Sequence, residues 1–99
     1  QAQKFNIEIK NMQKEIQKNN KQINKLNDEI AEVQKEIERI NKEKLYQTES
    51  EQAESDSLIA DANSTIASKQ KQIQELIADT DEINKRIEMK NREKTDLGI

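Results

Sequence analysis

The sequence contains no Pro, and its only Gly is Gly98, so no obligatory helix breaker precedes the last two residues. It also lacks Cys and His, which excludes disulfide and thiolate chemistry and removes the usual soft metal ligands. No apolar run approaches the roughly 18 residues of a membrane span, so we expect no membrane insertion. The absence of Cys does not distinguish between compartments, and the localisation stays unknown from the sequence.

Large apolar side chains are too few for a globular core of normal size. Trp is absent, Phe and Tyr occur once each, and apolar residues make up 31% of the 99 residues. A chain with 37% charged residues is either disordered or a long helical rod. The two classes differ in the periodicity of their apolar residues, because only a periodic pattern forms a continuous contact strip.

The apolar residues of the first half recur at alternating steps of three and four, which is the heptad pattern of a coiled coil. Five successive equivalent positions in this stripe are Ile, a regularity that chance placement does not explain. The members of the first stripe are Ala2, Phe5, Ile9, Met12, Ile16, Asn19, Ile23, Leu26, Ile30, Val33, Ile37 and Ile40.

A second, weaker heptad stripe occupies the other half of the chain. Its members are Ile59, Ala62, Ile66, Lys69, Ile73, Leu76, Thr80, Ile83, Ile87, Lys90, Lys94 and Leu97. When the two stripes are extended toward each other, their heptad registers disagree by one residue. Residues 45–68, which cover the gap between the stripes and the start of the second stripe, carry five acidic residues and no Lys or Arg. We therefore expect a structural break inside this acidic segment.

Antiparallel pairing of the two stripes predicts an all-α fold, a single coiled-coil segment over residues 1–99 that folds into a two-helix hairpin. The predicted arms span residues 2–47 and 52–97, each close to 70 Å at about 1.5 Å per residue, and the turn spans residues 48–51. Thr48 and Glu51 have the spacing of a capping box, with Thr at the cap and Glu three residues later.

The register of the hairpin follows from the polar residues in the stripes. When the numbers of facing residues add to 99, Asn19 faces Thr80, and the two uncharged polar side chains can satisfy each other. The same register sets Lys69 against Ile30, where a single Lys can lay its stem along an apolar neighbour and reach water. A sum of 106 would leave Asn19 and Thr80 each without a partner, at a cost of about 1–3 kcal/mol.

A continuous helix that pairs in parallel with copies of itself, as a dimeric or trimeric rod, is the alternative fold. Parallel pairing sets each stripe residue against its own copy, so Lys44, Lys69, Lys90 and Lys94 would each face a Lys. Facing lysines repel each other, and the sequence therefore favours the hairpin.

The turn tip is the candidate partner-binding site. It combines three apolar residues that lie off the stripes with acidic residues, and its members are Leu45, Tyr46, Glu49, Glu51, Glu54, Asp56 and Leu58. An alternative interpretation is that Leu45 and Leu58 widen the core at this end. Ile7, Ile77 and Met89 also lie outside the stripes, as exposed residues or as a second stripe for pairing hairpins.

No residue pattern points to catalysis or to a cofactor. The acidic cluster of Asp28, Glu29, Glu32 and Glu36 is the nearest approach to a cation site, and a solvated charged face explains it better. Lysines outnumber acids in the first 25 residues, but without Arg or interleaved aromatic residues this pattern does not favour nucleic-acid binding. We expect protein partners or self-association, and no small-molecule ligand.

The sequence predicts a non-enzymatic spacer and protein–protein interaction arm. Because the chain has neither an initiator Met nor a signal-peptide pattern, we expect it to belong to a longer protein. Two alternatives remain open from the sequence: a parallel oligomerisation rod of a filament, surface fibre or scaffold, and a regulatory arm of an enzyme or motor whose catalytic domain lies elsewhere.

Overall fold

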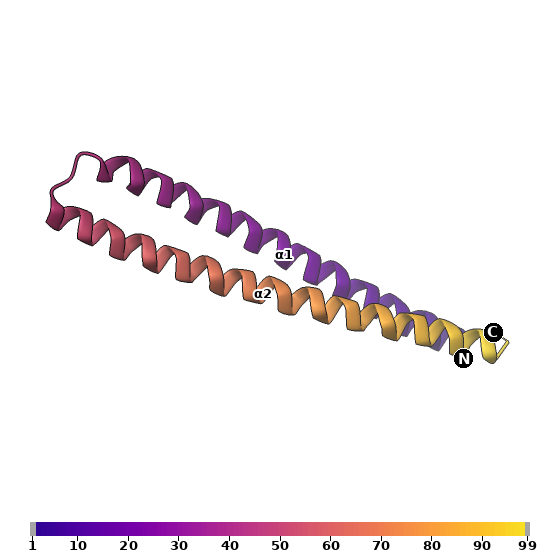
Figure 1. Ribbon diagram of the computed structural model, residues 1–99. Helices are drawn as coiled ribbons and strands as arrows, with labels where there is room; N and C mark the ends of the chain where they lie inside the picture. The colour runs from indigo at the N-terminus through magenta and orange to yellow at the C-terminus, as the bar shows by residue number, and fades with distance from the viewer. Residues whose placement is uncertain (1, 99) are drawn as a thin grey trace. The chain divides into compact units, whose positions relative to one another are not determined.

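The computed structural model describes residues 2–98, which form two α-helices joined by a short connection (Figure 1). Helix α1 spans Ala2–Lys44 and helix α2 spans Glu49–Asp96. The connection reverses the chain, so the predicted all-α helical hairpin is confirmed. The alternative of an unbroken helix is not adopted, because residues 45–48 lie outside both helices.

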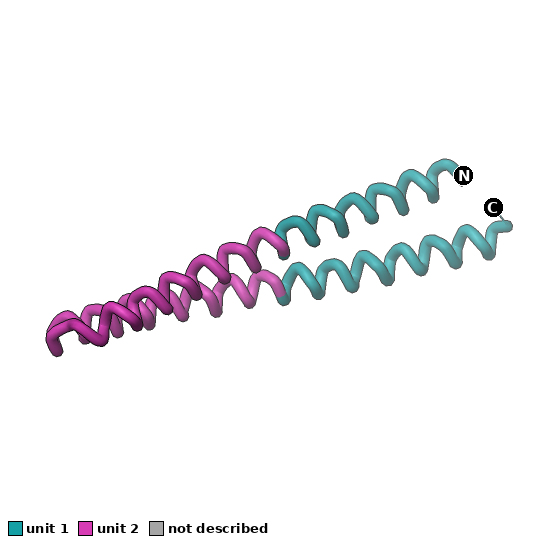
Figure 2. The backbone as a smooth tube through the Cα atoms, turned by 90° about the horizontal axis from the view of Figure 1, so that it is seen from above, with its two compact units in different colours: residues 1–23, 74–99 teal, residues 24–73 magenta. Residues whose placement is uncertain are grey.

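The chain divides into two compact units (Figure 2). The turn unit is Asn24–Ile73, which contains the connection, and the terminal unit comprises residues 2–23 and 74–98 of the described chain. Each unit contains one segment of α1 and one segment of α2, and the two segments run antiparallel.

The heptad stripes face the partner helix in both units. Every stripe residue from Ala2 to Ile40 and from Ile59 to Lys94 is buried or half-buried, whereas Leu97 is exposed. The side chains that form the seam include Ile9, Ile16, Ile23, Ile30, Ile37, Ile40, Ile59, Ile66, Ile73, Leu76, Ile83 and Ile87. A narrow seam suits two helices, because each helix buries only the side that faces the other.

Cross-helix contacts in the turn unit follow the register in which residue numbers add to about 99. Lys69 Nζ lies 2.6 Å from Glu29 Oε2, and Lys44 forms an ion pair with Asp56. The residue numbers of these pairs add to 98 and 100. The ammonium group of Lys69 therefore reaches an acid on the opposite helix, a contact that the sequence did not predict.

The terminal unit has the same register and four polar contacts between its helices. Asn19 Nδ2 donates to Thr80 Oγ1 at 3.2 Å and to Asp79 Oδ2 at 2.8 Å. The other two contacts join Lys90 Nζ to Glu8 Oε2 at 2.8 Å and Lys94 Nζ to Asn6 Oδ1 at 2.7 Å. Each Lys of the α2 seam in this unit thus reaches a polar group of α1.

The connection between the helices lies three residues earlier than the sequence predicted. It comprises residues 45–48 instead of 48–51, and the helical arms are Ala2–Lys44 and Glu49–Asp96 instead of 2–47 and 52–97. The physical reason is the capping of α2. Thr48 acts as the N-cap, so the helix begins at the next residue, and Glu49, Ser50 and Glu51 form its first turn.

Candidate interaction site at the turn

A capping box fixes the start of α2. The Thr48 hydroxyl accepts a hydrogen bond from the Glu51 backbone N–H at 3.3 Å, and the Thr48 backbone N–H donates to Glu51 Oε1 at 3.2 Å. The Thr48 hydroxyl also donates to the same carboxylate oxygen at 2.9 Å. The hydrogen bonds that the Thr48 hydroxyl and the Thr48 backbone N–H donate to this carboxylate lower the pKa of Glu51, because they stabilise its charged form. The reciprocal pattern satisfies two backbone donors that the helix start leaves unpaired.

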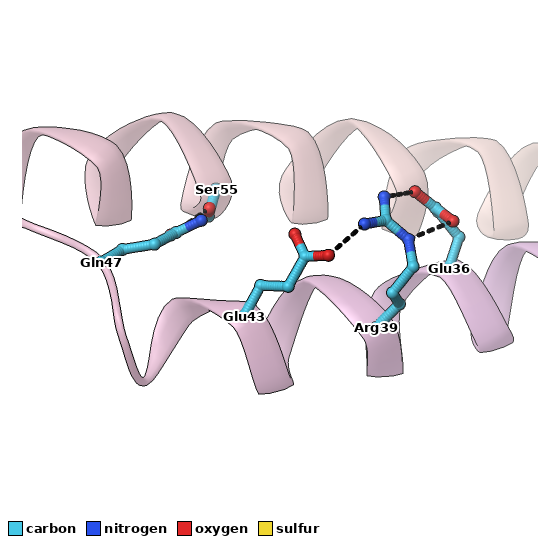
Figure 3. A network of polar contacts seen from close by, with 5 residues as sticks. All are labelled: Glu36, Arg39, Glu43, Gln47 and Ser55. Carbon is cyan, nitrogen blue, oxygen red and sulfur yellow. Dashed lines mark hydrogen bonds and ion pairs between the residues drawn. The ribbon is translucent and has the colours of Figure 1, made fainter.

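Side chains of α2 hold the end of α1 and the connection. Gln52 Nε2 donates to the carbonyl oxygens of Lys44 at 3.1 Å and Gln47 at 3.3 Å. Ser55, only 5% exposed, donates through its hydroxyl to Gln47 Oε1 at 2.6 Å, and Figure 3 shows these two side chains facing each other. The connection is therefore tied to α2 on its inner side.

The apolar side chains of the turn tip are exposed to solvent. Leu45 is 78% exposed and Tyr46 is 91% exposed, and both lie in the connection. Leu58 lies further along α2 and is 56% exposed. Leu45 and Leu58 therefore do not widen the core, and all three side chains are accessible to a partner.

The acidic residues of the turn tip fall into two groups. Glu51 serves the cap and Asp56 pairs with Lys44, so both have a role within the chain. Glu49 and Glu54 lie on exposed positions of α2, and Glu49 is in the first turn, where the helix dipole favours negative charge.

Arg39 pairs with two further acids on the neighbouring part of α1. Its guanidinium donates from Nε to Glu36 Oε2 at 3.0 Å and from Nη1 to Glu43 Oε1 at 2.6 Å (Figure 3). A second contact joins Nη2 to Glu36 Oε1, which makes the Glu36 pair bidentate. The contact with Arg39 lowers the pKa of Glu36 and both acids raise that of Arg39. Arg39 thus offsets one of the two negative charges.

The acidic cluster on α1 forms a charged surface with basic neighbours. An open hollow there is lined by Lys25, Asp28, Glu29, Ala31, Glu32 and Lys35. Glu29 pairs with Lys69, and Glu32 lies 3.7 Å from Lys35. Among residues 2–98, no group of acids has an arrangement that could hold a metal ion.

The sequence did not predict the acidic partners of the seam lysines. Glu8 and Glu29 are half-buried beside Lys90 and Lys69, and these ion pairs lower the pKa of both carboxyl groups while partial desolvation opposes the shift. Both acids precede an Ile of the first stripe, next to the seam. The sequence did contain a signal for these ion pairs: Lys69 and Lys90 each face a part of the first stripe where a Glu directly precedes an Ile.

Comparisons with known proteins identify no relative of this chain, so its function is inferred from the structure. A scan against protein-family models, a search of curated proteins and a search of solved structures each returned no match. Within the described part of the chain, neither helix has a segment apolar and long enough to cross a bilayer.

Proposed function

We propose that this chain is a non-enzymatic spacer and protein–protein interaction arm, and that its turn tip contacts a protein partner. One observation carries the proposal: Leu45 and Tyr46 are adjacent, strongly exposed and held in a connection whose inner side is fixed by hydrogen bonds. An exposed aromatic and aliphatic pair on a rigid support is a suitable anchor for an interface, because little conformational entropy is lost on binding.

The charges of the turn tip support a partner surface with apolar and basic groups. Leu45 and Tyr46 would fill apolar depressions of the partner, while Glu49 and Glu54 attract its basic residues. The spacer role is supported by the two long helices and by the cross-helix polar contacts that fix their register within each unit.

The lowered pKa values of four carboxyl groups also support a structural role for these groups. A general acid or base at neutral pH needs a carboxyl pKa raised toward neutrality. The pKa values of Glu8, Glu29, Glu36 and Glu51 are instead lowered, each by a hydrogen bond or ion pair that stabilises the charged form. These contacts serve the fold, and we propose no catalytic role for them.

Replacing both exposed residues of the connection tests the proposal. The double variant Leu45→Ser, Tyr46→Ser removes apolar surface without touching the seam, so the helical circular dichroism and its thermal transition should persist while partner capture falls. A photoreactive phenylalanine analogue at Tyr46, used in cells, should crosslink a discrete protein, whereas the same analogue at exposed Lys71 should not.

The matched control removes two exposed apolar side chains from the terminal unit. Met89 is 61% exposed and Leu97 is 57% exposed, so Met89→Ser, Leu97→Ser makes a comparable change elsewhere. Capture should be unaffected in this control. Equal capture by the turn-tip variant and the wild type would refute the docking role.

A further inference from the structure

Leu58 forms the centre of a small acidic face on α2. It is 56% exposed and lies four residues after Glu54 and three residues before Asp61, both of them exposed. Residues three and four apart are neighbours on one side of a helix, so the two carboxylates flank the apolar side chain. Residues 45–68 contain no Lys or Arg, and no basic side chain in this stretch offsets the two acids. We call Glu54, Leu58 and Asp61 the acidic face.

The same chain carries a complementary face on α1. Ile7 is 60% exposed and lies three residues after Lys4 and three residues before Lys10, which are also exposed. The first 25 residues contain six lysines and two glutamates, so the surroundings of Ile7 are positively charged. We call Lys4, Ile7 and Lys10 the basic face.

We propose that two copies of this chain associate by docking the basic face of one copy on the acidic face of the other. Ile7 would contact Leu58, and one lysine would lie beside each carboxylate. Because both apolar residues have charges about one turn before and one turn after, the match holds for either direction of the α1 segment along α2. The inference deepens the proposed function, since it names a second copy as one partner of Leu58 and Glu54.

The chemistry of the two faces predicts a weak, salt-sensitive association. Each face offers a single apolar side chain, and ion pairs between exposed side chains contribute little when salt is high. Sedimentation equilibrium should therefore find dimers or larger species at low ionic strength. The same protein should be monomeric in about 1 M salt, where charges are screened beyond about 3 Å.

Charge reversal on each face separates this proposal from general electrostatic attraction. The variants Glu54→Lys, Asp61→Lys and Lys4→Glu, Lys10→Glu should each weaken self-association by about tenfold or more, because attraction becomes repulsion. Mixing the two variants should restore association, since each then finds the opposite charge on the other. Circular dichroism should show both variants folded, because the four side chains lie outside the seam.

Matched controls change the net charge equally at other exposed positions. Asp81→Lys, Glu88→Lys and Lys71→Glu, Lys85→Glu should leave the association near the wild-type level. A wild-type chain that is monomeric at low salt would overturn the proposal, as would equal weakening by the controls or a mixture that fails to associate. Binding of Lys4 and Lys10 to vesicles of anionic lipid, without self-association, would overturn it in favour of a membrane surface.

The self-association test can succeed or fail independently of the partner-capture test on Leu45 and Tyr46. Leu45 and Tyr46 are unchanged in every charge variant, so partner capture through them can persist when self-association fails. Conversely, loss of capture in Leu45→Ser, Tyr46→Ser with self-association intact supports both proposals.

Discussion

The turn unit and the terminal unit each contain a seam between α1 and α2 but fix its register by different means. In the turn unit, four residues join the helices, and the Thr48 cap and the Gln52 and Ser55 hydrogen bonds leave little freedom to slip. In the terminal unit no connection joins the two segments directly, and the contact between Asn19 and Thr80 aligns them. A short loop thus fixes the register in the turn unit, while a polar layer fixes it in the terminal unit.

The two units also differ in how completely they bury apolar side chains. Leu26, Ile30 and Ile40, which are at most 8% exposed, all belong to the turn unit. Ile83, at 2%, is the one buried apolar side chain among the described residues of the terminal unit. Segments with fewer buried apolar contacts open more readily, so we expect the terminal unit to open first.

Truncation of a buried side chain in each unit gives the largest expected effect. Leu26→Ala should lower the free energy of unfolding by about 2–4 kcal/mol, since it leaves a cavity in the seam. Ile83→Ala should reduce hydrogen-exchange protection mainly in the terminal unit, whereas Leu26→Ala should reduce it in both. Urea unfolding, monitored by circular dichroism, measures the free energy of unfolding. Amide hydrogen exchange measures the protection of each unit.

An exposed residue provides the control for these truncations. Met89→Ala should change the free energy of unfolding by less than about 0.5 kcal/mol, because the side chain is already 61% exposed. If Ile83→Ala and Leu26→Ala removed protection equally everywhere, the chain would unfold as one cooperative body and the distinction between the units would be lost.

Removal of the Thr48 N-cap tests how much this cap, which belongs to the turn unit alone, stabilises the fold. Thr48→Ala should lower the free energy of unfolding by about 1 kcal/mol, because the Glu51 N–H loses its acceptor. Thr65→Ala is the matched control, since the Thr65 hydroxyl only donates to the Asp61 carbonyl within α2. A loss of similar size in both variants would show that the cap contributes nothing specific.

The heptad periodicity predicted the helices and the seam, because the contact between two helices is set by which residues recur every three and four positions. The polar residues Asn19 and Thr80 predicted the register for the same reason: an unpaired polar group costs energy, and one register pairs them. The same reasoning predicted less about the candidate interaction site at the turn. Exposure of Leu45 and Tyr46 depends on where the connection begins.

The position of the connection could not be read from the seam alone. Both stripes can be extended through Lys44, Gln47, Gln52 and Ser55, and all four are buried or half-buried, so periodicity does not show where helical geometry ends. The cap at Thr48 decides the start of α2, and hydrogen bonds from Gln52 to Lys44 and Gln47 stabilise the preceding reversal. The capping-box spacing was visible in the sequence, but its consequence for the boundary was missed.

Acid titration gives the smallest expected effect and compares the Lys–Glu pairs of the two units. Glu8 and Glu29 have folded-state pKa values below the ordinary 4.5, so each pair stabilises the fold above that pH and loses its contribution as the pH falls through the folded pKa. The urea midpoint should therefore be nearly constant between about pH 7 and pH 5 and should fall below about pH 4.5.

The variants Glu8→Gln and Glu29→Gln assign this pH dependence to the individual pairs. Each should have a lower urea midpoint than the wild type at neutral pH, and the difference should vanish by about pH 3, because a protonated Glu resembles Gln. Glu88→Gln, on an exposed position of α2, serves as the control and should show no such difference. Should the gap for Glu29→Gln persist in acid, the pair with Lys69 would act through packing instead of charge. A gap that closes for Glu8→Gln alone would confine the electrostatic contribution to the terminal unit.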